Sequence, residues 1–275
     1  MTDPLDILES RDWLSLRDHF QNAEPFPSIC LDNFLKADVA QEIAESYPSY
    51  DDANALGMEF LSVNSKKKIQ VTEEEKFPEP VAQLSRMLAS DEFRACLSQM
   101  TGIESLCWDD HLGGGGMHLS ANAGTLDVHV DFNYSEHLQL YRRLNILIYL
   151  NPVWQESWGG HVELWDRDVK HCVQSHAPIL NRCVLFETSD ISFHGLNPVR
   201  SLPEGVSRNS FAAYYYTESS GENTGAVWGG NHSTIFKTRP NEFVKGMVAM
   251  PIENAMHSSR RLKSKIGKAL RRVLR

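Results

Sequence analysis

The sequence lacks the features that would place the chain in a membrane or in the secretory pathway. No apolar run reaches the roughly 18 residues of a transmembrane helix. The first residues, MTDPLDILESRDW, are acidic, whereas a secretory signal peptide is basic and then apolar. We therefore expect a cytoplasmic protein.

Cysteine is scarce and shows no pairing pattern. The five cysteines are widely spaced, odd in number and contain no CxxC pair: Cys30, Cys96, Cys107, Cys172 and Cys183. A small disulfide framework or a zinc site would need paired or clustered cysteines. We expect reduced and mostly buried thiols.

The sequence also has no internal repeat and no Pro/Ser-rich linker, and the run Gly113–Gly116 lacks the Lys-Ser/Thr of a phosphate-binding loop. Hydrophobic residues make up 41% and charged residues 23%, which is typical of a globular protein. We predict a single domain over 1–259, with a helical support region (1–110), a β core (111–217) and a C-terminal extension (218–259).

Charge is unevenly distributed along the chain. The net charge is −9, yet residues 260–275 contain eight basic and no acidic residues. The acidic body argues against binding to nucleic acid. In the tail, apolar residues recur at helical spacing between the basic ones: Leu262, Ile266, Ala269, Leu270, Val273 and Leu274. Two interpretations stay open, namely peripheral contact with an anionic inner membrane surface, or contact with this chain or a second subunit.

The hydrophobic pattern changes from helical to strand-like along the chain. Helical spacing before Pro48 and between Pro80 and Gly102 predicts support helices. After Trp108, short runs predict strands at about 116–121, 125–131, 143–150, 160–166, 179–187, 191–197 and 209–217. This order indicates a mainly β fold with flanking helices.

Candidate metal ligands lie on two of these predicted strands. Strand alternation places Asp127, His129 and Asp131 on one face. A second histidine, His194, lies in a later strand. Two histidines and one carboxylate on one side of a metal leave positions open for other ligands, as in non-haem iron oxygenases. With eleven histidines in the chain, a solvated or core histidine is the alternative.

Downstream residues extend this pattern. Arg208 directly precedes the apolar run at 211–216, and a buried arginine requires an anion. The combined stretches are His129-Val-Asp131, Arg142-Arg-Leu-Asn-Ile-Leu-Ile-Tyr-Leu-Asn151, Trp158-Gly-Gly-His-Val-Glu-Leu-Trp165, Asn181-Arg-Cys-Val-Leu-Phe186, His194 and Arg208. Over 112–217 the chain thus resembles the prolyl-4-hydroxylase-like branch of the 2-oxoglutarate/Fe(II)-dependent oxygenases.

The resemblance implies a double-stranded β-helix, or jelly-roll, core and specific residue roles. His129, Asp131 and His194 would hold Fe(II), and Arg208 would bind the distal carboxylate of the co-substrate 2-oxoglutarate. Tyr149 would hydrogen-bond the same carboxylate, with a core aromatic as the alternative, and Asn145 lies on the same strand face. The gap before Arg208 indicates a loop insertion at 200–207. The tyrosine that some relatives carry before the HxD strand is replaced near His118 or Leu119.

The implied reaction is O2-dependent hydroxylation of an unactivated C–H bond, with release of succinate and CO2. The substrate stays open among a small amino acid, a peptidyl residue and a saccharide, because one fold hosts many chemistries. A non-oxidative, cupin-like metal protein or binding module is the alternative. Arg142 and Arg143 would bind an anionic substrate or pair with acidic residues, while Glu163 would face the cavity or solvent.

Overall fold

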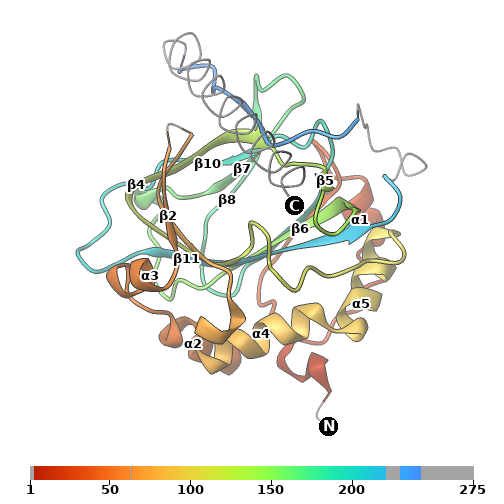
Figure 1. Ribbon diagram of the computed structural model, residues 1–275, viewed down its shortest axis with the longest axis horizontal. Coiled ribbons are helices and arrows are strands. Elements are labelled where there is room, and N and C mark those ends of the chain that lie inside the picture. The colour runs from red at the N-terminus through yellow and green to blue at the C-terminus, as the bar shows by residue number, and fades with distance from the viewer. Residues whose placement is uncertain (1–2, 63, 221–229, 243–275) are drawn as a thin grey trace, which may run out of the picture.

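The computed structural model describes residues 3–62, 64–220 and 230–242, and its centre is an antiparallel sheet (Figure 1). The strands are β1 (Ser28–Leu31), β2 (Met58–Leu61), β3 (Ser65–Val71), β4 (Gly116–Val130), β5 (Tyr134–Ser135), β6 (Leu140–Tyr149), β7 (Val162–Trp165), β8 (Cys172–His176), β9 (Cys183–Glu187), β10 (His194–Leu196), β11 (Arg208–Thr217) and β12 (Ile235–Lys237). No helix within the described ranges is both long and apolar enough to cross a bilayer.

The helices come early in the chain. They are η1 (Pro4–Ile7), α1 (Arg17–Gln21), α2 (Ala37–Ser46), α3 (Tyr50–Leu56), η2 (Glu74–Lys76), α4 (Glu79–Ala89), α5 (Asp91–Thr101) and the later η3 (Glu156–Trp158). The Ser90 hydroxyl accepts from the backbone N–H of Phe93 and caps α5, which ends at Gly102 in the left-handed conformation. The support helices expected before Pro48 and between Pro80 and Gly102 are confirmed.

The sheet folds into two layers that share the long strand β4. The strand order is β1-β9-β6-β11-β4-β10-β7-β8, and every pair is antiparallel. The first half of β4 pairs with β11 and β3, and its second half pairs with β10 and β12. This arrangement confirms the predicted mainly β jelly roll with flanking helices.

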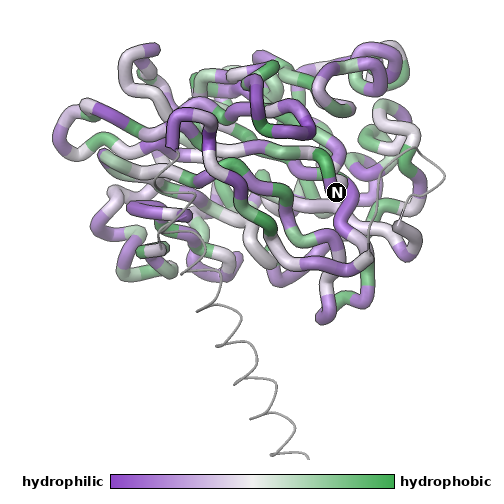
Figure 2. Tube along the Cα trace, turned by 90° about the horizontal axis from the view of Figure 1, so that it is seen from above, coloured by the Kyte–Doolittle hydropathy of each residue, from purple (hydrophilic) through white to green (hydrophobic). Residues whose placement is uncertain are grey.

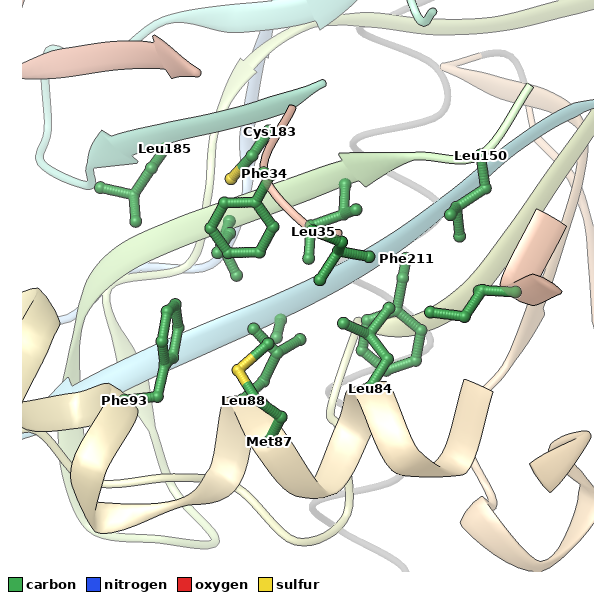
Figure 3. Packing of buried hydrophobic residues seen from close by; sticks show 14 of the residues in the cluster. Phe34, Leu35, Leu84, Met87, Leu88, Phe93, Leu150, Cys183, Leu185 and Phe211 are labelled. Carbon is green, nitrogen blue, oxygen red and sulfur yellow. The ribbon is translucent and has the colours of Figure 1, made fainter. Parts of the chain in front are cut away.

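Strand alternation separates a helix-covered core from the space between the layers. On β6, Leu144, Ile146 and Ile148 belong to the core under the helices, whereas Asn145 and Leu147 line a cavity on the other face. The strand β11 divides in the same way. In Figure 3, Leu84, Met87 and Leu88 of α4 point from the helix toward these strands. Figure 2 shows hydrophobic and hydrophilic stretches alternating along the chain, as this division requires.

The N-terminal third contains more strand than the sequence pattern predicts. Within 1–110 the strands β1, β2 and β3 accompany the helices, so the predicted helical support region also contributes strands. The strand β1 pairs with β9, and β3 pairs with β4, so this region extends the core sheet. Its short polar runs, such as the three lysines at 66–68, do not carry the hydrophobic pattern of a strand.

Three further predictions are adjusted or left open. The expected strands at 116–121 and 125–131 form one continuous strand, β4, whose register with β3 shifts between Ser120 and Thr125. The five cysteines form no disulfide, but only Cys183 is fully buried and Cys172 is exposed. The basic tail, 260–275, lies outside the described residues, so its contact with a membrane or a second subunit stays a prediction.

Candidate functional site

The three predicted metal ligands meet between the two layers. His129 and Asp131 lie at the end of β4, and His194 starts β10, where its backbone is paired directly with His129. The ligand atoms of the three side chains lie within 4.8 Å of one another. Each histidine Nε2 is 3.5 Å from an Asp131 carboxylate oxygen, and the two rings are 4.3 Å apart between centroids. Two neutral donors and a carboxylate at this separation fit a divalent metal.

Backbone hydrogen bonds orient both imidazole rings. His129 Nδ1 lies 2.7 Å from the carbonyl oxygen of Asp127, and His194 Nδ1 lies 2.9 Å from that of Ser192. A carbonyl can only accept, so Nδ1 carries the proton and Nε2 presents its lone pair to the centre of the triad. Burial, followed by the proximity of His129, lowers the pKa of His194 to about 4, so that ring is neutral at physiological pH.

The carboxylate of the triad has cationic and polar support. Arg142 Nη2 lies 3.0 Å from Asp131 Oδ2, and Asn145 donates to the same oxygen at 3.3 Å. Burial alone would raise the pKa of Asp131, but Arg142 and the two histidines outweigh it and hold the pKa well below its usual range. The Arg142 guanidinium is itself buried and stacks 3.3 Å from the centroid of the Tyr214 ring. Asp131 is therefore ionised and oriented as a metal ligand would need to be.

A cavity of about 560 Å³, including its open mouth, extends from the triad. It is lined by Lys68, His118, Ser120, Leu126, His129, Asp131, Asn145, Leu147, Val162, His194, Gly195, Leu196, Arg208, Ser210 and Tyr214. These side chains come from both layers of the jelly roll. The triad occupies one end, which we call the metal end, and Arg208 marks the other, which we call the cation end.

At the cation end a buried arginine has no carboxylate partner among the described residues. Arg208 Nε donates to the carbonyl of Gly160 at 2.6 Å, and Nη1 donates to Ser210 Oγ at 3.4 Å. The Tyr149 ring lies 4.9 Å from the guanidinium carbon, and its buried hydroxyl has no hydrogen-bond partner in the described structure. Burial raises the pKa of Tyr149 to about 12, so it stays a neutral donor. Both groups can donate to an anion from the cavity.

The two glycines of the Trp-Gly-Gly sequence at 158–160 leave room for the Arg208 side chain. Gly160 has a φ of +70°, and a Cβ there would lie 3.0 Å from Cδ of Arg208. Gly159 has a φ of +65°, and a Cβ there would lie only 2.4 Å from the carbonyl oxygen of Pro198. Only glycine combines this conformation with such close approach, so the motif brings the Gly160 carbonyl against the guanidinium.

The other predicted residues divide between the cavity and its surroundings. Asn145 faces the cavity but hydrogen-bonds Asp131 at the metal end, so a contact with the co-substrate stays a prediction. Arg142 and Arg143 pair with acidic residues, Asp131 and Glu187, as one of the two alternatives held. Glu163 does not line this cavity; its mostly buried carboxylate pairs with Arg239 at 2.9 Å.

His118 and Leu119 are the two positions near which some relatives of the resembled family carry a tyrosine. His118 lines the cavity, whereas Leu119 is buried in the helix-side core, so His118 occupies the polar position. Its Nε2 lies 3.1 Å from the carbonyl oxygen of Gly114, and burial and Lys68 hold its pKa well below the ordinary value. His118 is therefore a neutral group beside the cation end.

Two residues at the site were missed by sequence reasoning. Lys68 of β3 lines the cavity, although its place in a run of three lysines suggests a solvated surface. Phe236 of β12 lies 5.3 Å from the His129 ring between centroids, and β12 belongs to the C-terminal extension. The available signal for Lys68 was its alternation with Ile69 and Val71, both buried.

Comparison with known proteins agrees with this geometry. Residues 116–216 match the family model described as the 2OG-Fe(II) oxygenase superfamily. Prolyl 3-hydroxylase OGFOD1 of Mus musculus is 28% identical over 224 residues, covering 71% of this chain and 34% of that protein. The Xenopus laevis protein of the same name is 27% identical over 142 residues, covering 48% of this chain and 24% of that one. The chain thus spans about a third or less of the curated relatives it matches.

Solved structures share the fold. A prolyl hydroxylase from Trichoplax adhaerens, in complex with a hypoxia-inducible-factor peptide fragment, superposes with a TM-score of 0.54 at 18% identity, covering 75% of this chain and 90% of that one. A prolyl-4-hydroxylase from Pseudomonas putida gives a TM-score of 0.53 at 17% identity, covering 74% and 98%.

Proposed function

We propose that this chain is a 2OG-Fe(II) oxygenase that hydroxylates a prolyl residue of a peptide or protein, consuming 2-oxoglutarate and O2. One observation carries the proposal. A buried arginine without a carboxylate partner in the described part of the chain faces the same cavity as the His-Asp-His triad. The triad fits Fe(II) and the arginine fits a dicarboxylate, so the two ends match this pair of ligands.

At the metal end, His129, Asp131 and His194 would hold Fe(II). The bound metal would activate O2, which is the oxidant, while 2-oxoglutarate would supply two electrons: one oxygen atom of O2 would enter succinate as CO2 leaves, and the other would enter a substrate C–H bond. The chain's own residues keep the ligand set ready. The carbonyls of Asp127 and Ser192 hold both Nε2 atoms toward the metal position, and Arg142 with Asn145 orients Asp131.

At the cation end, Arg208 and Tyr149 would bind the distal carboxylate of 2-oxoglutarate. Gly160 and Ser210 hold the guanidinium in place before the ligand arrives, which reduces the entropy lost on binding. This end separates the proposal from a cupin-like metal protein. A barrel that only binds metal gains nothing from a buried cation without a partner, and such a cation costs folding free energy.

The prolyl substrate is supported by the relatives that share the sequence. The mouse and Xenopus laevis relatives are both named prolyl 3-hydroxylase, and the mouse protein aligns over 71% of this chain. The cavity is lined by both the triad and Arg208, and a substrate C–H bond would have to approach the triad. Among the classes left open by the sequence, the peptidyl residue therefore has the most support.

A product assay tests the proposal. Fe(II)-loaded protein is incubated with 2-oxoglutarate, O2 and a panel of proline-containing peptides, free proline, other amino acids and saccharides. We expect succinate formation to be stimulated by peptides, with one oxygen atom added to proline by mass spectrometry, and matched peptides with alanine in place of proline to be inactive. Stimulation by free amino acids or saccharides alone would refute the peptidyl substrate while leaving the oxygenase reaction intact.

A further inference from the structure

The cation end of the cavity contains a second basic side chain in direct line with Arg208. Lys68 of β3 is paired with Ser120 of β4, and Ser120 is paired in turn with Arg208 of β11. Paired residues on neighbouring antiparallel strands project from the same face of a sheet. Lys68, Ser120 and Arg208 therefore form one row across three strands, and all three line the cavity.

An irregularity in the β3–β4 pairing sets the position of Lys68. The register shifts between Lys66 and Lys68, and the intervening Lys67 has a φ of +51°. Such a bulge re-aims the side chains that follow it. Lys66 and Lys67 stay exposed, whereas Lys68 is half-buried and enters the cavity. The run of three lysines thus divides into two solvated charges and one directed inward.

The charges around Lys68 are unbalanced. Asp131 is the one acidic residue among those lining the cavity, and its carboxylate already faces Arg142 and both histidines. Burial, and after it the charge of Arg208, lowers the pKa of Lys68 to about 8, which outweighs the opposite effect of Asp131. Two like charges that share a row repel each other unless an anion lies between them. The free protein therefore holds two basic groups poised around a space for an anion.

We infer that Lys68 is a second binding residue for the distal carboxylate of 2-oxoglutarate, which it would share with Arg208. The inference rests on the proposed function, since it requires 2-oxoglutarate to occupy this cavity. Ser120, between the two basic residues, can donate its hydroxyl to the same carboxylate. The carboxylate would then be bound by Lys68 from β3 and by Arg208 from β11, the strands on either side of β4. Tyr149, on the other neighbour of β11, would be a third donor.

Calorimetric titration of 2-oxoglutarate into Mn(II)-loaded protein without O2 tests this inference. A charge-assisted hydrogen bond contributes about 1.5–3 kcal/mol, so Lys68→Met should raise the dissociation constant on the order of 10-fold or more. Lys68→Arg should restore most of the affinity. Lys66→Met is the matched control, because it removes the same charge from an exposed position of the same strand. It should leave the affinity unchanged.

A second readout separates binding from a merely structural role. Because the charge of Lys68 is destabilised in the free protein, Lys68→Met should have an equal or higher midpoint of thermal unfolding without ligand. The rise in that midpoint caused by 2-oxoglutarate should be smaller than in the parent. A variant that loses stability with and without ligand in equal measure would contradict the inference.

Arg208→Ala in the same titration distinguishes the two levels of the proposal. If Arg208→Ala weakens 2-oxoglutarate binding and Lys68→Met does not, the second binding residue is refuted and the proposed co-substrate site stands. If neither variant changes the affinity, the proposed site itself is wrong. If Lys68→Met instead weakens only the binding of the peptide substrate, Lys68 acts on the substrate and the inference is overturned.

Discussion

The two ends of the cavity differ in how their charges are compensated. At the metal end the single carboxylate, Asp131, is matched by Arg142 and hydrogen-bonded by Asn145. At the cation end Arg208 and Lys68 face no carboxylate of their own among the described residues. The acidic residue of the metal end is therefore matched within the chain, whereas the basic residues of the cation end have no matching carboxylate among the described residues.

This difference teaches what each end is built to hold. Charges that are paired within the chain serve to orient a ligand set, whereas charges left unpaired in a buried place cost stability unless a bound molecule neutralises them. The two adjacent arginines of β6 are both paired within the chain: Arg142 pairs with Asp131, and Arg143 pairs with Glu187. Arg208 shows the second.

The largest effect is expected at the metal end. Asp131→Ala removes a ligand and should abolish turnover. Loss of residues that merely support a metal ligand costs about 10 to 100-fold in affinity, so removing the ligand itself should weaken metal binding by at least that factor. Mn(II) binding, followed by calorimetry, measures the change.

A matched control is needed because Asp131→Ala also leaves Arg142 buried without its carboxylate. Glu187→Ala does the same to Arg143, whose partner is outside the triad. Both variants should lose stability, by roughly 3–5 kcal/mol for a broken buried pair. Glu187→Ala should nevertheless retain its metal affinity, and an equal loss in both variants would contradict the assignment of the triad.

The next effect is expected at the cation end. Arg208→Ala should raise the dissociation constant of 2-oxoglutarate roughly 100-fold or more, since losing one side of a buried ion pair costs about 3–5 kcal/mol. Metal affinity should stay at the parent value. Arg208→Lys keeps the charge but loses the two-pronged geometry, so its affinity should lie between the two. An unchanged affinity of Arg208→Ala for 2-oxoglutarate would contradict the assignment of the cation end as the co-substrate site.

Much of this site could be predicted from the sequence, because its residues occur in motifs whose spacing reflects strand geometry. The alternation of His129 and Asp131 and the placement of Arg208 before an apolar strand pointed to residues that the structure brings together around one cavity. For Lys68, alternation with Ile69 and Val71 indicates its face of the strand but not that this face borders the cavity. Its direction depends on the register shift between β3 and β4, which is set by pairing between distant segments.

The same limit applies to other parts of the fold. Strands such as β1 and β12 are short, and their pairing with β9 and β4 depends on contacts far apart in sequence. Glu163 lies on a strand whose neighbours border the cavity, yet it turns to Arg239, a residue of the C-terminal extension. Sequence patterns predict which face a residue occupies but not which distant segment covers that face.

A smaller effect is expected from Tyr149→Phe. The hydroxyl has no hydrogen-bond partner in the described structure, so its removal should not destabilise the free protein. A hydrogen bond formed only with the ligand contributes about 0.5–1.5 kcal/mol, or up to roughly 3 kcal/mol when the partner is charged, so 2-oxoglutarate should bind several-fold more weakly. Thermal unfolding and calorimetric titration check both halves of this prediction.

The smallest effect is a pH dependence of stability. The pKa of Lys68 is lowered to about 8 in the folded chain, from an ordinary value near 10.5, by burial and by Arg208. Below pH 8 the residue is protonated in both states, and the folded state bears the cost. Between pH 8 and about 10.5 the unfolded chain binds more protons, so the contribution of Lys68 to the unfolding free energy becomes more favourable as pH rises.

Comparison with Lys68→Met isolates this contribution from other titrating groups around the residue, namely His118, Asp131, Arg142 and Arg208. Any stability advantage of the variant over the parent should shrink as pH rises from 8 to 10.5 in thermal unfolding without ligand. A constant difference across that range would show that the charge of Lys68 is not destabilised by folding.

We propose that one cavity contains both an Fe(II)-binding triad and a binding site for the distal carboxylate of 2-oxoglutarate. Oxygen-dependent conversion of 2-oxoglutarate to succinate by the Fe(II)-loaded protein, measured with the peptide panel, tests it most directly. We expect succinate from the parent and from Glu187→Ala, and none above background from Asp131→Ala. Succinate formation by Asp131→Ala at the parent rate, or its absence from the parent with every substrate, would contradict the claim.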